Sequence, residues 1–199
     1  MCPQASNGLD RLVDSSSGAL LVTGKGDSLW FPKSGTAYRH ADGDDSYNVL
    51  VKNANNSFTI TSKFGDKSNF STLGLLTSVV DTNSNTTSFA YADQNSDGVA
   101  NELVSVTDPF GRVTNLNYTS GKVTSIAHFS GRTTTLANSS GNLVGYVLTD
   151  PDGTGPLGSP SISFAYSAFV TTESRSVAAL PYRRGAQLIP LLSLPECTK

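Results

Sequence analysis

One segment of the sequence has the residue types and spacing of a metal-binding loop. Oxygen-bearing side chains, together with one backbone carbonyl, recur at every second position: Asp93, Asn95, Asp97, Val99 and Asn101. Gly98 occupies the sixth position of this loop, where a sharp turn is needed. Oxygen ligands at alternate positions with glycine at the sixth are typical of the first part of a calcium loop. The segment is therefore a candidate calcium site of weak affinity, with Val99 contributing its carbonyl.

Two features of the same segment favour a different interpretation. The twelfth position of the loop is Val104, where a calcium loop has a bidentate acid. In addition, no helix pattern flanks the loop on either side. The alternative is a solvated insertion between two strands. Apart from calcium, nothing in the sequence indicates a cofactor.

No combination of nucleophile, acid and base indicates an enzyme. His40 and His128 lie far apart in the sequence, and neither belongs to a metal-binding pair such as His-x-x-x-His. The Gly-x-Ser-x-Gly pattern of serine hydrolases does not occur. Lys25 is followed by Gly26, where a phosphate-binding loop has a hydroxyl residue. We therefore expect a protein without catalytic activity.

The elements that would position these residues come from an internal repeat. Residues 74–91, 101–118 and 121–138 align without gaps, and the same pattern begins again at Gly141. Successive starts are 27, 20 and 20 residues apart, and an insertion at 93–101 explains the longer first offset. Self-similarity at a short period is typical of architectures in which each unit buries its apolar face against its neighbours.

Each repeat has the pattern of a β-hairpin. Asp108-Pro109-Phe110-Gly111 has the residue preferences of a type I turn, with Asp108 placed to accept hydrogen bonds from nearby N–H groups. The alternation over residues 112–118 puts Arg112, Thr114, Leu116 and Tyr118 on one face and Val113, Asn115 and Asn117 on the other, which predicts a strand. Residues 150–153 repeat the same turn signal.

These patterns predict an all-β fold of stacked antiparallel hairpins that form a curved, spiralling sheet. Residues 1–72 are expected to form an irregular β region that leads into the repeats, and residues 73–171 contain the repeats. Residues 172–199 lack the pattern and read as a non-repeat tail, either poorly ordered or docked on the sheet edge. Within the whole chain, only residues 174–180 are compatible with a helix.

The composition excludes several classes of function. Hydrophobic residues make up 37% of the chain and charged residues 15%, and the net charge is −2. Nucleic-acid binding is disfavoured because no basic cluster is available to neutralise phosphates. The apolar runs are too short to span a membrane, and residues 1–8 have no signal-peptide pattern. Cys2 and Cys197 are interpreted as two lone thiols, with a disulfide that closes a very long loop as the alternative.

The repeat resembles the RHS, or YD, repeat family. Residues 76–91 and 103–118 are similar to the pattern Leu-Thr-Ser-Val-x-Asp-x-x-Gly-Arg-x-Thr-x-Leu-x-Tyr. The resemblance covers roughly residues 35–170 and is most specific over 73–153. The chain departs from the pattern at three positions: His128 stands in place of Asp, Asn85 in place of Gly and Asn138 in place of Tyr.

The resemblance implies a β-sheet that spirals into a hollow shell. In bacteria such shells usually belong to large secreted or surface proteins that enclose a toxin or present wall-binding modules. We therefore expect this chain to be a structural, non-enzymatic piece of such a protein. Its partners would be other segments of the larger chain or the enclosed polypeptide. An isolated piece would have open sheet edges, so we also expect it to self-associate.

An extracellular module that binds carbohydrate or cell wall, with or without calcium, is the rival hypothesis. Five aromatic residues are candidate sugar-stacking platforms: Phe89, Tyr91, Tyr118, Phe164 and Tyr166. They recur at the same strand positions, which favours packing within the sheet instead. Aromatic residues exposed outside the repeat register would favour the binding module, whereas strictly internal ones would favour the shell.

Overall fold

The structure, a computed structural model, describes residues 9–39, 47–153, 158–166 and 171–176, and no helix occurs in these ranges. The first four strands are β1 (Arg11–Asp14), β2 (Gly18–Val22), β3 (Ser28–Ser34) and β4 (Ala37–Tyr38). The others are β5 (Val49–Lys52), β6 (Phe58–Thr61), β7 (Lys67–Phe70), β8 (Leu76–Val80), β9 (Thr86–Ala92), β10 (Glu102–Thr107), β11 (Val113–Thr119), β12 (Lys122–Ala127), β13 (Thr133–Ser139), β14 (Asn142–Val147), β15 (Ser161–Tyr166) and β16 (Thr171–Ser176). The predicted all-β fold is confirmed.

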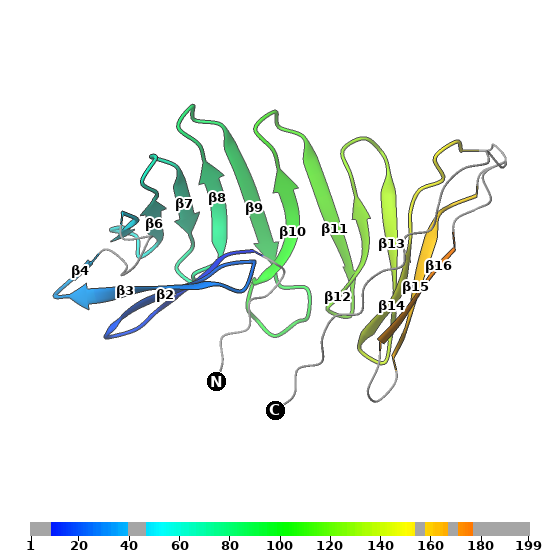
Figure 1. Cartoon of the computed structure of the whole chain (residues 1–199), viewed down its shortest axis with the longest axis horizontal. Helices are drawn as coiled ribbons and strands as arrows, with labels where there is room; N and C mark the ends of the chain where they lie inside the picture. The colour runs from blue at the N-terminus through cyan, green and yellow to red at the C-terminus, as the bar shows by residue number, and fades with distance from the viewer. Residues whose placement is uncertain (1–8, 40–46, 154–157, 167–170, 177–199) are drawn as a thin grey trace, which may run out of the picture.

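The strands form two antiparallel sheets in which each strand pairs with its neighbour in the sequence. β1–β4 make a four-stranded sheet, and β5–β16 make a twelve-stranded sheet. Figure 1 shows β6–β16 side by side in a curved sheet, with β2 and β3 running across one end of it. Every connection inside the large sheet is a hairpin, so the chain advances through it without a crossover.

Seven copies of one five-residue turn occur in the described parts of the chain. In each, the first N–H donates to the carbonyl of the fifth residue, and the fourth N–H donates to the carbonyl of the first. The seven turns are residues 23–27, 53–57, 62–66, 71–75, 81–85, 108–112 and 128–132. The fourth residue has a positive φ in every copy, as in a type I turn followed by a glycine bulge. The turn predicted at Asp108-Pro109-Phe110-Gly111 is thus confirmed.

The first side chain of these turns also holds the turn together. Asp108 Oδ1 accepts hydrogen bonds from the N–H groups of Phe110 (2.9 Å) and Arg112 (3.0 Å). Desolvation acts to raise the pKa of Asp108, but these bonds and the Arg112 charge outweigh it and lower the pKa below its usual range. His128 occupies the same first position in its own turn, where its N–H donates to the Arg132 carbonyl. The interpretation of His128 as a turn residue in place of Asp is confirmed.

Three details of the sequence interpretation need correction. The residue that takes the place of glycine in turn 81–85 is Ser84, with φ 67°, and not Asn85, which corresponds to Arg112. Residues 174–176 belong to strand β16 and not to a helix, because β16 pairs with β15 over six residue pairs. The turn signal at 150–153 lies inside a longer connection between β14 and β15, which Leu148 N–H and Pro160 O close at 2.9 Å.

The zone boundaries predicted at 72/73 and 171/172 do not coincide with breaks in the sheet. β5, β6 and β7 precede the first boundary but already belong to the large sheet. The second boundary falls at the start of β16, which extends the sheet to Ser176. The sheet therefore extends further toward both ends than the sequence repeat does. Residues beyond Ser176 lie outside the described part of the chain.

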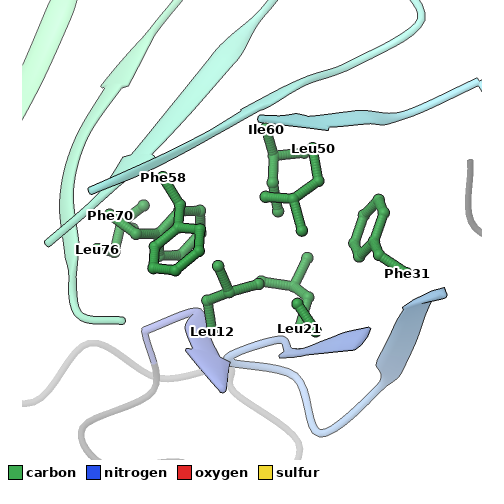
Figure 2. Close-up of a cluster of buried hydrophobic side chains, with 9 residues drawn as sticks. Leu12, Leu21, Phe31, Leu50, Phe58, Ile60, Phe70 and Leu76 are labelled. Atoms are coloured by element: carbon green, nitrogen blue, oxygen red, sulfur yellow. The ribbon is translucent and has the colours of Figure 1, made fainter. Parts of the chain in front are cut away.

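The hydrophobic core lies between the two sheets, at the end where β1–β3 cross β5–β8. Its buried members are Leu12, Ala19, Leu21 and Phe31 from the small sheet and Leu50, Phe58, Ile60, Phe70 and Leu76 from the large one, of which Figure 2 labels all but Ala19. Burial of each large side chain contributes roughly 1.5–3 kcal/mol. The face of the large sheet that carries Phe58, Ile60 and Phe70 is called the core-side face below.

Polar contacts join the two sheets around this core. Leu12 N–H donates to the Gly74 carbonyl at 2.9 Å. Asp14 accepts hydrogen bonds from Tyr38 Oη (2.7 Å) within the small sheet and from Lys52 Nζ (3.1 Å) on β5. Burial acts to raise the pKa of Asp14, but the Tyr38 and Lys52 bonds and the charges of Lys33 and Lys52 lower it overall. Asp14 is thus an ionised link between the sheets.

A side-chain amide or hydroxyl closes the open end of each repeat hairpin by donating to a carbonyl of the paired strand. The donor–acceptor pairs are Tyr91 and Leu76 (2.9 Å), Tyr118 and Leu103 (2.7 Å), Asn138 and Val123 (2.9 Å), and Tyr166 and Leu143 (2.6 Å). The amide of Asn138 therefore keeps the bond that tyrosine makes in the other hairpins. Burial raises the pKa of Tyr91 to about 12, so this hydroxyl is a donor at neutral pH.

We expect Gly74→Ala to destabilise the protein far more than Gly131→Ala. Each glycine is the fourth residue of its own copy of the five-residue turn, and the two have similar positive φ values of 73° and 83°. A Cβ at Gly74 would lie 1.7 Å from the Leu12 carbonyl oxygen, whereas a Cβ at Gly131 meets nothing within 4 Å. Gly131→Ala should cost only about 1–2 kcal/mol of left-handed strain. Denaturant unfolding measures both, and equal losses would contradict the packing of β1 on the 71–75 turn.

We expect Tyr118→Phe to lower the free energy of unfolding by about 1–2 kcal/mol, because it leaves the carbonyl of the buried Leu103 without its partner. Tyr166→Phe is the matched control: its hydroxyl makes the same bond, but the side chain is 49% exposed. Water replaces the lost donor there, so the loss should be well under about 1 kcal/mol. Urea titration compares the two variants, and equal effects would refute a role for burial.

Candidate functional site

The predicted calcium residues lie together in the exposed connection between β9 and β10. The Asp93 carboxylate accepts hydrogen bonds from the N–H groups of Ser96 (2.7 Å) and Gly98 (2.8 Å). Asn95 and Asp97 bond to each other, with Asn95 Nδ2 donating to Asp97 Oδ2 at 3.0 Å. Gly98 has φ 84°, which is the sharp turn that its position in the pattern predicts. The loop is thus held together by side-chain oxygens that accept backbone N–H groups.

The other two predicted ligands do not join this set. The Val99 carbonyl accepts the Asn101 N–H at 3.0 Å. Glu102 accepts the Gln94 N–H at 3.1 Å, and Val104 is the extra residue of a β-bulge between Leu103 and Ser105. In the described ranges, no three acidic, histidine or cysteine side chains gather as metal ligands. Internal hydrogen bonds account for the loop shape, and the calcium site stays a prediction.

The loop also forms one wall of an open groove on the face opposite the core side. Asn95 packs against the 120–121 turn, since a Cβ at Gly121 would lie 2.9 Å from the Asn95 Cβ. The groove encloses about 520 Å³, and its lining includes Gln94, Ser105, Asn115 and Asn117. These side chains carry amides and a hydroxyl but no acid–base pair. Tyr118 lines the groove as well, and its hydroxyl donates to the Leu103 carbonyl.

We expect the melting temperature to be the same in about 5 mM calcium as in EDTA. This concentration is high enough for the test, since weak extracellular calcium modules bind at about 0.1–1 mM and would be saturated. The internal hydrogen bonds of residues 93–101 supply the order that a metal would otherwise supply. Asp97→Ala is the control, since it removes a central ligand of the predicted site. A calcium-dependent rise in the wild type that is absent in Asp97→Ala would establish the site.

The histidine of the described chain has a serine of its own turn within hydrogen-bond distance. His128 Nδ1 lies 2.8 Å from Ser130 Oγ, and the imidazole packs against Phe129 at a tilt of 46°, with ring centres 4.1 Å apart. Within the described residues, the imidazole makes no hydrogen bond to a carboxylate, and Ser130 is its partner. His40, Cys2 and Cys197 lie outside the described residues.

The core-side face of the large sheet is apolar well beyond the core. Paired residues of antiparallel strands project to the same side of the sheet. The strand register therefore shows which residues of the later strands lie on the same face as Phe70. Thr114 and Thr134 also lie on this face, but most of its residues are apolar. Its apolar residues on β9–β15 include Phe89, Tyr91, Leu103, Val106, Leu116, Tyr118, Val123, Ile126, Leu136, Leu143, Tyr146, Ile162 and Phe164. Among the described residues, Leu103 is the last hydrophobic residue in the sequence that is fully buried. The others are only partly covered by the described chain.

Four of the five strand aromatics are partly covered, as the packing interpretation predicts, whereas Tyr166 is 49% exposed. A second set of aromatics lies outside the strands. Phe89, Tyr91 and Tyr118 lie in the strand register on the core-side face, and two of them make the hairpin bonds described above. Phe64 and Phe110 lie in hairpin turns and are 78% and 83% exposed. Sequence analysis missed this second set. The available signal was a phenylalanine inside a turn motif whose other residues are polar.

The sequence matches no protein-family model and none of the curated proteins with which it was compared. Within the described parts of the chain, no helix is able to cross a lipid bilayer.

Proposed function

We propose that the chain is a structural, non-enzymatic segment of an RHS/YD-repeat protein, whose curved sheet encloses or presents another polypeptide. The observation that carries this proposal is the core-side face. β1–β3 cover it over β5–β8, yet the same apolar register continues to β15. A sheet face of this length that is half-exposed calls for a further covering layer.

The geometry of the repeat supports the assignment to this family. In the RHS pattern, tyrosine ends each unit and a leucine begins it. In two successive hairpins of this chain, the tyrosine hydroxyl donates to the carbonyl of a leucine fifteen residues earlier. Asn138 makes the same bond across the same fifteen residues. The consensus tyrosine therefore has a physical role in this chain, which makes the sequence resemblance more than a similarity of composition.

The mechanism of enclosure is burial of apolar surface. Leu116, Ile126 and Leu136 project from successive strands onto the core-side face. A polypeptide laid across them removes their surface from water, which contributes about 25 cal/mol for each Å² of apolar area. The opposite face has Ser, Asn, Thr and Ala at the corresponding positions, such as Ser105, Asn115 and Ala127. Enclosure on one side and solvent on the other follow from this asymmetry.

A cross-linking experiment tests which face meets another polypeptide. A photo-reactive phenylalanine analogue is placed at Leu116 on the core-side face or at Asn115, its neighbour on the opposite face, in the full chain in its native cells. We expect cross-links from position 116 to a polypeptide encoded in the same or an adjacent reading frame. Position 115 should give none. Equal yields from both positions, or products that contain copies of this chain alone, would refute enclosure.

A further inference from the structure

Four of the hairpin turns lie along one border of the large sheet. They are residues 62–66, 81–85, 108–112 and 128–132, and Figure 1 shows them along the upper border. Tyr47 lies at the same border, because Val49 of β5 pairs with Thr61, just before the first of these turns. Leu148 directly follows β14 and lies there too. We call this border the turn edge.

The turn edge carries large apolar side chains that the fold leaves in solvent. Phe110 and Phe64 are 83% and 78% exposed, and Tyr47, Phe129 and Leu148 are exposed as well. Phe64 and Phe110 both occupy the third position of the five-residue turn, whose hydrogen bonds come from the backbone and from the first side chain. The turn therefore does not need a ring at this position. Large exposed side chains without a role in folding indicate a contact surface.

The apolar side chains of the turn edge are spread along a line. Because neighbouring strands lie about 4.8 Å apart, successive hairpins advance by roughly 10 Å, and the border from β5 to β14 is roughly 40 Å long. Turn 81–85, which has no apolar residue, separates Phe64 from Phe110. A stable protein interface buries about 800 Å² on each partner around a continuous apolar core. Separate protrusions in a row do not form such a core, whereas a fluid lipid surface deforms around each of them.

A basic side chain lies beside the rings at two places on the turn edge. Lys63 Nζ lies 4.5 Å from the centre of the Tyr47 ring. The Arg112 guanidinium lies 5.2 Å from the centre of the Phe110 ring and 4.4 Å from that of Phe129, so these two rings leave no empty slot for a small ligand. At a membrane surface, apolar side chains enter the acyl boundary while neighbouring ammonium or guanidinium groups stay at the level of the lipid phosphates.

The charge balance of the turn edge selects the kind of lipid. Anionic bilayers attract clusters of cations. Among the described residues of this border, the cations are Lys63, Lys67, Arg112 and Arg132, and the carboxylates are Asp66, Asp81, Asp108, Asp150 and Asp152. Asp108 also forms an ion pair with Arg112. With no excess of cations, attachment depends on buried apolar area, which a zwitterionic bilayer accepts as well as an anionic one does.

We propose that the turn edge is a membrane contact surface, which inserts Tyr47, Phe64, Phe110, Phe129 and Leu148 into the headgroup region of a zwitterionic bilayer. These side chains enter together because they belong to one sheet, so contacts that are weak one by one add up to reversible attachment. The strands stay outside the lipid. This inference does not depend on the enclosure proposal, because it concerns the border of the sheet and not the core-side face.

Co-sedimentation of the full chain with vesicles of pure phosphatidylcholine tests this proposal. We expect binding that persists in about 0.5 M salt, where attraction between exposed charges is largely screened. The triple variant Phe64→Ser, Phe110→Ser, Phe129→Ser loses most of the inserted apolar area, so its partition onto vesicles should fall by about tenfold or more.

The control variant is Leu73→Ser, Val99→Ser. Both residues are exposed and apolar, but they lie in the β7–β8 and β9–β10 connections at the opposite border. Leu73 also occupies the third position of its own five-residue turn, as Phe64 and Phe110 do. This variant should bind vesicles as the wild type does.

A fluorescent reporter tests the same contact without relying on a loss of binding. Phe110→Trp places an indole at the tip of turn 108–112, and Val99→Trp places one at the opposite border. We expect vesicles to shift the emission of Phe110→Trp to shorter wavelength and to leave that of Val99→Trp unchanged. The wild type, whose only tryptophan is Trp30, supplies the baseline. Equal shifts in the two variants, or a shift in neither, would overturn the proposal.

Several results of the vesicle assay would overturn it as well. They are the absence of binding to phosphatidylcholine, binding that the triple variant retains, and binding that needs anionic lipid and disappears in salt. Self-association that the triple variant loses, seen by sedimentation velocity without any lipid binding, would identify the turn edge as a contact between copies of the chain. The triple variant should keep the wild-type melting temperature, and a lower one would show that the rings serve the fold instead.

Discussion

The structure depends on the packing of the small sheet against the first strands of the large one. Phe31 and Leu12 from the small sheet and Phe70 from the large sheet are the largest fully buried side chains among the described residues. An antiparallel sheet with one apolar face is unstable in water until something covers that face. β1–β3 provide the cover for β5–β8, and the Leu12–Gly74 hydrogen bond fixes their position. The later hairpins then extend from a sheet that is already formed.

Each later hairpin is stabilised mainly by contacts with its neighbours. The five-residue turn closes one end, and a tyrosine or asparagine side chain closes the other. Stability in such an array is close to a sum of unit and interface terms, as in other repeat proteins. Substitutions are therefore absorbed locally. Ser84 replaces a turn glycine and Asn138 replaces a tyrosine, and both hairpins keep their geometry.

Local chemistry allowed the strands and turns to be predicted, whereas longer-range features were missed. Asp108, Pro109 and Gly111 specify a turn by their own preferences, and residues 112–118 alternate because one side of β11 is apolar. The covering role of β1–β3 depends on residues such as Leu12 and Phe70, which belong to one core although they lie 58 positions apart, and no local pattern encodes this. Phe110 was read only as a turn residue. Its exposure depends on the path of the folded turn, and Phe64 and Phe129 are exposed at the same edge of the sheet.

The two proposed activities use different parts of one sheet, and this separation follows from β-geometry. Side chains within strands point to one face or the other, so a face can be apolar for packing while its reverse stays polar. Side chains at hairpin turns instead point along the strand direction, beyond the edge of the sheet, and so belong to neither face. Phe110 therefore protrudes without disturbing Leu116 or Asn115 on the strand that follows. A repeat that stacks hairpins can line an interior with its strands while its turns contact a ligand outside.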